Sequence, residues 1–123
     1  SSDMREIEAA IAAGNERAKL ALDMYENRIV KYVGAFAAEM GGVDIIVFTG
    51  GVGENQFMTR ERVCENLGFM GVKIDKQLNN GLRGQEVDLS AADSKVKVVV
   101  IPTDEEYMIA RDTEAIIEGR PIE

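Results

Sequence analysis

The chain has 123 residues, which is enough for one compact domain. Its 14 Lys and Arg against 22 Asp and Glu give a net charge of −8, which argues against nucleic-acid binding, because such surfaces need cations. With no histidine and a single cysteine, Cys64, the chain cannot form a Ser-His or Cys-His catalytic pair, an internal disulfide or a Cys/His zinc site. No signal peptide or membrane span is recognisable, so we expect a cytoplasmic protein.

The first third of the chain predicts two helices. Ser2 or Asp3 can cap a short helix over residues 4–13, which Gly14 ends. A long amphipathic helix follows over residues 15–40 and would be roughly 39 Å long at about 1.5 Å per residue. Such a helix extends beyond a small domain, so we expect part of its apolar stripe to face other protein. The stripe comprises Leu22, Tyr25, Ile29, Val33, Phe36 and Met40, and the charged and polar residues on mostly other faces are Asp23, Glu26, Asn27, Arg28 and Lys31.

The middle of the chain predicts a strand, a glycine loop and a helix. Residues 43–48 form an almost continuous apolar run rich in β-branched residues, which is typical of a buried parallel strand. Residues 49–53, TGGVG, predict a flexible loop. Asn55 or Thr59 would cap the next helix, whose Val63 and Leu67 would face the core.

The last third predicts a second apolar strand. Residues 71–75 indicate a short edge strand, and residues 76–93 a turn-rich excursion. The second apolar strand spans residues 95–101, and Thr103 or Asp104 would cap a final amphipathic helix. Two apolar strands separated by a helix predict a parallel pair. We therefore expect an α/β fold with two or three mostly parallel strands, a thin sheet typical of part of a larger domain.

The glycine loop is the first candidate site, because open α/β sheets bind ligands at the carboxyl ends of their strands. Its glycines allow a ligand to lie directly on the backbone. It is not a Walker loop, because Glu54 and Asn55 stand where Lys and Ser or Thr are needed. It is not a Rossmann fingerprint either, because Gln56 replaces the last glycine or alanine. A plain strand-to-helix turn stays the alternative.

The acidic residues after the second apolar strand are the second candidate. If the two strands are adjacent and parallel, Glu105 lies close to the Gly51 loop, where a carboxylate could hold Mg²⁺. Alternatively, Asp104, Glu105 and Glu106 only favour the positive end of the final helix. On chemistry alone, Asp3 and Arg5 are a helix cap and a solvated charge. Cys64 is a small apolar filler.

Several motifs together resemble the acetate kinase family, which belongs to the superfamily of acetate and sugar kinases, heat-shock proteins and actin. Residues 43–55, VDIIVFTGGVGEN, are similar to the family's adenosine motif. Arg60 follows at the family's position, and further matches in chain order are residues 3–5 (DMR), 18–24 (AKLALDM), 67–75 (LGFMGVKID) and 101–113 (IPTDEEYMIARDT). Members are much longer than this chain. The resemblance thus implies that residues 1–123 are the C-terminal portion of a nucleotide-binding domain with an actin-like (ribonuclease H-like) fold, with its N-terminal part missing.

The resemblance also implies a reaction and a site. The reaction is reversible transfer of the γ-phosphoryl group of ATP to acetate, giving acetyl phosphate and ADP, with Mg²⁺ and in a homodimer. The catalytic residues would all lie upstream, so we expect the isolated chain to be inactive. Glu105 would be the Mg²⁺-associated carboxylate. The nucleotide contacts would be Asp3, Met4, Arg5, Gly51, Val52, Gly53, Glu54 and Asn55.

Two alternatives stay open. A propionate or butyrate kinase has the same chemistry with a different acyl pocket, and residues 51–55 lean toward the acetate and propionate branch. The second alternative is a nucleotide-binding or assembly module that has kept the fold and lost the catalytic activity. The intact Glu105 and glycine loop weigh against it.

Overall fold

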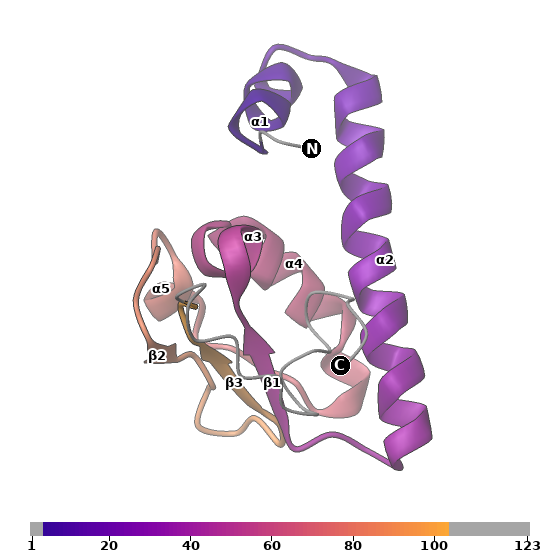
Figure 1. Ribbon diagram of the computed structural model, residues 1–123, viewed down its shortest axis with the longest axis vertical. Coiled ribbons are helices and arrows are strands. Elements are labelled where there is room, and N and C mark those ends of the chain that lie inside the picture. The colour runs from indigo at the N-terminus through magenta and orange to yellow at the C-terminus, as the bar shows by residue number, and fades with distance from the viewer. Residues whose placement is uncertain (1–3, 104–123) are drawn as a thin grey trace.

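The computed structural model describes residues 4–103. Figure 1 shows the long helix α2 (Glu16–Met40) running along one side of the molecule, with the short helix α1 (Met4–Ala12) beside its first turns. A small sheet and the remaining helices lie beside the rest of α2. The two helices predicted for the first third of the chain are confirmed, within one residue at each end.

The ends of α2 follow from local chemistry. The Asn15 side chain accepts a hydrogen bond of 3.0 Å from the backbone N–H of Ala18, which caps the first turn. At the other end, Gly41 adopts the left-handed conformation with φ of 79°, and its N–H bonds the carbonyls of Ala37 and Ala38. A glycine takes this conformation without a Cβ clash, so α2 ends there.

The buried face of α2 only partly matches the predicted stripe. Leu22, Ile29 and Val33 are buried as expected, but Tyr25 is 38% exposed. The prediction that Glu26 lies on a solvent face is wrong, because its side chain is buried against the neighbouring helix α4 (Phe57–Asn66). Its ion pair, described below, compensates the cost of removing the charge from water.

The sheet contains the predicted parallel pair and one antiparallel neighbour. Strand β1 (Ile45–Phe48) pairs in parallel with β3 (Lys97–Val100), and β3 pairs with the antiparallel β2 (Val87–Asp88), in the order β1-β3-β2. Among the described residues the sheet is therefore mixed, not mostly parallel. The edge strand expected over residues 71–75 is wrong, because only isolated bridges form, from Val72 to Val96 and from Ile74 to Ser90.

The core lies between α2, the sheet and α4. As predicted, Val63 and Leu67 are buried in the core. Val63 lies within α4, and Leu67 lies between α4 and the short 3-10 helix η1 (Gly68–Met70). The excursion over residues 76–93 contains the single-turn helix α5 (Lys76–Asn79), capped by the Asp75 side chain, and then β2. No helix in residues 4–103 is long and apolar enough to cross a membrane. The expected final helix lies outside the described residues.

Candidate functional site

Strand β1 leads directly into a short helix, α3 (Gly50–Asn55). Thr49 is extended, and Gly50 turns the chain with a φ of 79°, which a residue with a Cβ rarely adopts. The flexible loop predicted over residues 49–53 is therefore wrong. Neither Asn55 nor Thr59 caps α4, because Gln56 occupies the N-cap position and its side chain makes no capping bond.

A fully buried arginine explains why a glycine-rich segment is helical here. The Arg60 Nη1 atom donates to the carbonyls of Gly53 and Glu54, at 3.0 and 2.9 Å, at the negative end of α3. Its Nε donates to Asn79 Oδ1 at 2.8 Å, and its Nη2 to the Leu82 carbonyl at 2.7 Å. All these acceptors are uncharged, and burial lowers the pKa of Arg60 to about 10. Arg60 thus joins α3, α5 and the segment that follows α5.

The three glycines of α3 differ in whether the fold requires a residue without a Cβ at their positions. Gly50 needs its positive φ. A Cβ at Gly53 would lie 3.2 Å from the Phe48 carbonyl carbon, so Gly53 lets α3 pack closely on the end of β1. A Cβ at Gly51 would meet nothing within 4 Å, and its φ is not in the left-handed region. The fold therefore does not require glycine at position 51, whose outer side is open.

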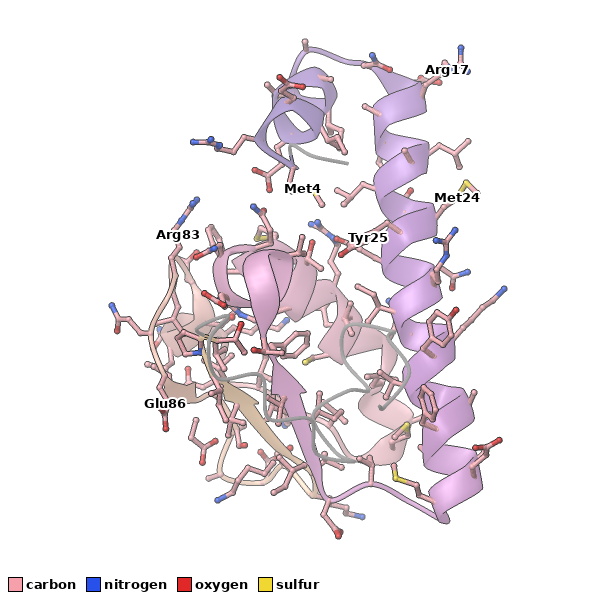
Figure 2. All side chains as sticks on the ribbon, viewed as in Figure 1. Met4, Arg17, Met24, Tyr25, Arg83 and Glu86 are labelled. Atoms are coloured by element: carbon pink, nitrogen blue, oxygen red, sulfur yellow. The ribbon has the colours of Figure 1, made fainter. Side chains whose placement is uncertain are left out.

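A hollow of about 310 Å³ lies between α3 and α2 at the carboxyl end of β1. It is lined by Tyr25 and Ile29 of α2, by Thr59 of α4, and by the run Phe48, Thr49, Gly50, Gly51, Val52 and Gly53. Figure 2 shows Tyr25 on the side of α2 that faces the end of the body formed by α3 and α4. Its place in the wall was missed by the sequence analysis, which assigned Tyr25 to the apolar stripe.

One wall of the hollow is held by an ion pair whose carboxylate, that of Glu26, is buried. Glu26 Oε1 accepts from Arg62 Nε, and Oε2 accepts from Arg62 Nη2, both at 2.8 Å. Oε2 also accepts from the Thr59 hydroxyl at 2.7 Å. The hydrogen bond with Glu26 raises the pKa of Arg62. Sequence reasoning missed this cluster, although position 26 lies on the same helical face as Leu22, Ile29 and Val33.

The predicted contacts on α3 come together with the end of β3. Glu54 Oε2 accepts hydrogen bonds from the Thr103 N–H at 3.1 Å and from its hydroxyl at 3.4 Å. The Thr49 hydroxyl donates to the Ile101 carbonyl at 2.7 Å. The parallel pair therefore brings residues 101–103 to the glycine segment. Glu105 itself lies outside the described residues.

The other predicted site residues lie as follows. Val52 and Asn55 are half-buried on α3. Met4 and Arg5 begin α1, and Figure 2 shows Met4 on the side of α1 toward α3 and α4. Asp3 lies outside the described residues, and so do Asp104 and Glu106.

The described carboxylates do not form a metal centre by themselves. Within residues 4–103, no group of three or more His, Cys, Asp or Glu side chains could hold a metal ion. Glu54 already bonds Thr103, and Glu26 bonds Arg62. Cys64 is buried, and burial raises the pKa of its thiol to about 12, although the nearby charge of Arg60 acts in the other direction. It is therefore an inert filler, as predicted.

A glycine-lined hollow at the carboxyl end of a parallel strand is the arrangement with which open α/β sheets bind ligands. Residues 1–111 match the acetokinase family, and the chain belongs to that family.

Known proteins similar to the chain are acetate and propionate kinases. It is 64% identical over 118 residues to the acetate kinase of Porphyromonas gingivalis strain W83, covering 96% of this chain and 30% of that protein. The crystal structure of Porphyromonas gingivalis acetate kinase superposes with a TM-score of 0.83, covering 94% of this chain and 29% of that one. A propionate kinase from Francisella tularensis is 32% identical, with a TM-score of 0.74, covering 95% and 28%. The chain therefore spans about 30% of the length of the relatives it matches.

Proposed function

We propose that the chain is the nucleotide-binding part of an acetate kinase, which transfers the γ-phosphoryl group of ATP reversibly to acetate. In this proposal residues 1–123 are the C-terminal portion of an actin-like nucleotide-binding domain. The observation that carries it is the open side of Gly51 beside the hollow of about 310 Å³. A ligand can approach the backbone there without displacing any side chain.

The residues of the chain would bind and orient the nucleotide. Val52 and Asn55 would contact it from α3, together with Gly51 and Gly53, and residues 3–5 would approach from α1. Glu54 lies on the same helix, and through its bonds to Thr103 it would hold α3 against the end of β3. Arg60 would be a positioning residue, because it fixes the carbonyls of Gly53 and Glu54.

Glu105 would be the carboxylate associated with Mg²⁺. The ion, when bound with the nucleotide, neutralises charge on the phosphate oxygens, and it usually shares few protein carboxylates with substrate phosphates. Glu105 stands two residues beyond Thr103, whose N–H and hydroxyl are bonded to Glu54 of α3, and a carboxylate is the kind of ligand that Mg²⁺ takes. We place the phosphoryl-transfer residues themselves outside this chain.

Acetate is the proposed acyl acceptor. The supporting observation is the higher identity to the acetate kinase of Porphyromonas gingivalis, 64%, than to the Francisella propionate kinase, 32%. A propionate or butyrate kinase is the nearest alternative. A nucleotide-binding module without catalysis is the alternative from another class.

Nucleotide binding is tested by titrating the chain with ADP and ATP in an isothermal calorimeter. We expect Gly51→Ala to lower the affinity tenfold or more, because the added methyl group occupies the surface on which the ligand lies. Gly34→Ala is a matched control, because a Cβ at Gly34 in α2 also meets nothing within 4 Å. Each change should leave stability unchanged or raise it by up to about 0.5–1 kcal/mol. Equal affinities for Gly51→Ala and Gly34→Ala would contradict the proposed site.

Catalysis is tested in a chimera. The matching segment of Porphyromonas gingivalis acetate kinase is replaced by this chain, and acyl phosphate formation is followed as the hydroxamate with acetate, propionate and butyrate. We expect turnover with acetate by the chimera and none by the isolated chain. Turnover by the isolated chain would show that the proposed division of the site is wrong. An inactive chimera that binds ADP would favour the non-catalytic module.

A further inference from the structure

Arg83 is held firmly beside α3 through both of its neighbours in sequence. The Leu82 carbonyl accepts from Arg60 Nη2 at 2.7 Å, and the Gly84 N–H donates to the Glu54 carbonyl at 3.2 Å. A Cβ built on Gly84 would lie 3.8 Å from Asn55 Oδ1, so this backbone also runs close to the Asn55 side chain. The backbone of Arg83 is thus fixed at the carboxyl end of α3.

The side chain of Arg83 is exposed and is not committed to a carboxylate. Its guanidinium carbon lies 6.0 Å from the centroid of the Phe57 ring. No salt bridge joins it to any other residue of the described part of the chain. Arg60 and Arg62, by contrast, already use their donors within the fold. Figure 2 shows Arg83 projecting from the end of the body nearest to α1, the end toward which Met4 also lies.

The position of Arg83 along α3 indicates which part of a ligand it would meet. The hollow is lined by residues 50–53 of α3, whereas Asn55 is the last residue of this helix and the backbone of Arg83 is held beside that end. The helix has six residues, or about 9 Å at 1.5 Å per residue. If the phosphate end of the nucleotide lies in the hollow, the rest of the molecule extends along α3 and its base lies near Asn55.

We propose that Arg83 is a further nucleotide contact, which stacks its guanidinium plane on the base while the Phe57 ring supports it from below. The proposal rests on the proposed nucleotide-binding function. A guanidinium group stacks readily on aromatic faces, and every nucleotide base has such a face. The backbone at Leu82 and Gly84 is already fixed by hydrogen bonds. Little backbone conformational entropy is therefore lost when a ligand binds.

The test compares ADP with adenosine, which has the same base and no phosphate. We expect Arg83→Ala to weaken the binding of both ligands to the chain by the same factor, five- to tenfold. Arg83→Lys should lose most of this affinity as well, because an ammonium group keeps the charge but not the plane. Arg17→Ala is the matched control, because it removes the same charge at the start of α2, away from α3. It should change neither affinity.

The outcomes separate this proposal from the proposed function. Weaker binding of ADP with unchanged adenosine would overturn the stacking role in favour of a phosphate contact. ADP and adenosine affinities equal to those of Arg17→Ala would overturn the assignment of Arg83 and leave the nucleotide site standing.

The chimera provides a second readout. There, Arg83→Ala should raise the KM for ATP five- to tenfold and leave kcat and the KM for acetate within twofold. Failure of both the chain and the chimera to bind any nucleotide would overturn the proposed function and the role of Arg83 together.

Discussion

Two regions of the molecule are held in different ways. Around α3 and α4, short and glycine-rich segments are fixed by buried polar side chains, with Arg60 making four hydrogen bonds to three separate segments. At the other end, α1 has no buried residue and packs mainly on α2. The first half of α2 leaves Leu20 59% exposed and Met24 58% exposed.

The difference shows which kind of sequence information fixes each region. The bounds of α1 and α2 follow from local sequence, because apolar periodicity predicts both helices and Asn15 and Gly41 mark the ends of α2. The helix α3 has poor intrinsic propensity, with three glycines in six residues, so it depends on contacts from residues distant in sequence. The candidate site is therefore built in the region that depends most on a few side chains.

The largest expected effect is the loss of Arg60. Arg60→Ala leaves the carbonyls of Gly53, Glu54 and Leu82 without their buried donor, and it should lower the free energy of unfolding by about 3 kcal/mol or more. Urea denaturation followed by circular dichroism measures this loss. Arg60→Lys is the sharper control, because it keeps the positive charge and loses the planar guanidinium group that reaches all four acceptors. It should recover less than half of the stability, and full recovery would show that charge alone is needed.

The second effect concerns the ion pair between α2 and α4. Glu26→Ala leaves Arg62 and the Thr59 hydroxyl without their acceptor. We expect a loss of about 2 kcal/mol, less than for a fully buried pair because Arg62 is about a third exposed. Asp23→Ala removes a carboxylate from the exposed pair with Lys19 on the same helix, and it should cost less than about 0.5 kcal/mol. Equal losses for the two variants would show that Glu26 contributes no more than a surface charge.

Much of the fold was predictable from local patterns. The caps at Asn15 and Gly41 and the apolar runs around β1 and β3 gave the long helix and the parallel pair. The sequence could not show that residues 50–55 are helical, because the cause is a hydrogen bond from Arg60, which follows them on another helix. For Glu26 the signal exists, since its position falls on the buried face of α2, but its charge by itself predicts exposure.

The sequence predicts the position of the glycine segment in the candidate site, but not the side chains that surround it. The carboxyl end of a parallel strand followed by glycines predicts a hollow at this edge of the sheet, and the structure has one beside α3. The side chains that line its far wall, Tyr25 and Thr59, depend on how α2 and α4 pack against each other, which periodicity alone does not give. Residue 83 could not be placed either, because its position depends on the hydrogen bonds of Leu82 and Gly84.

The smallest expected effect lies in the loosely held region. Leu20→Ala should change the free energy of unfolding by less than about 0.5 kcal/mol, because its side chain is already mostly in water. Leu22→Ala is the matched comparison two residues further on, where the same side chain is 7% exposed, and it should cost about 2 kcal/mol or more. Chemical denaturation of both variants gives the difference directly. A loss for Leu20→Ala as large as that for Leu22→Ala would mean that the outer face of α2 is covered in solution, and the contrast between the two regions would then no longer hold.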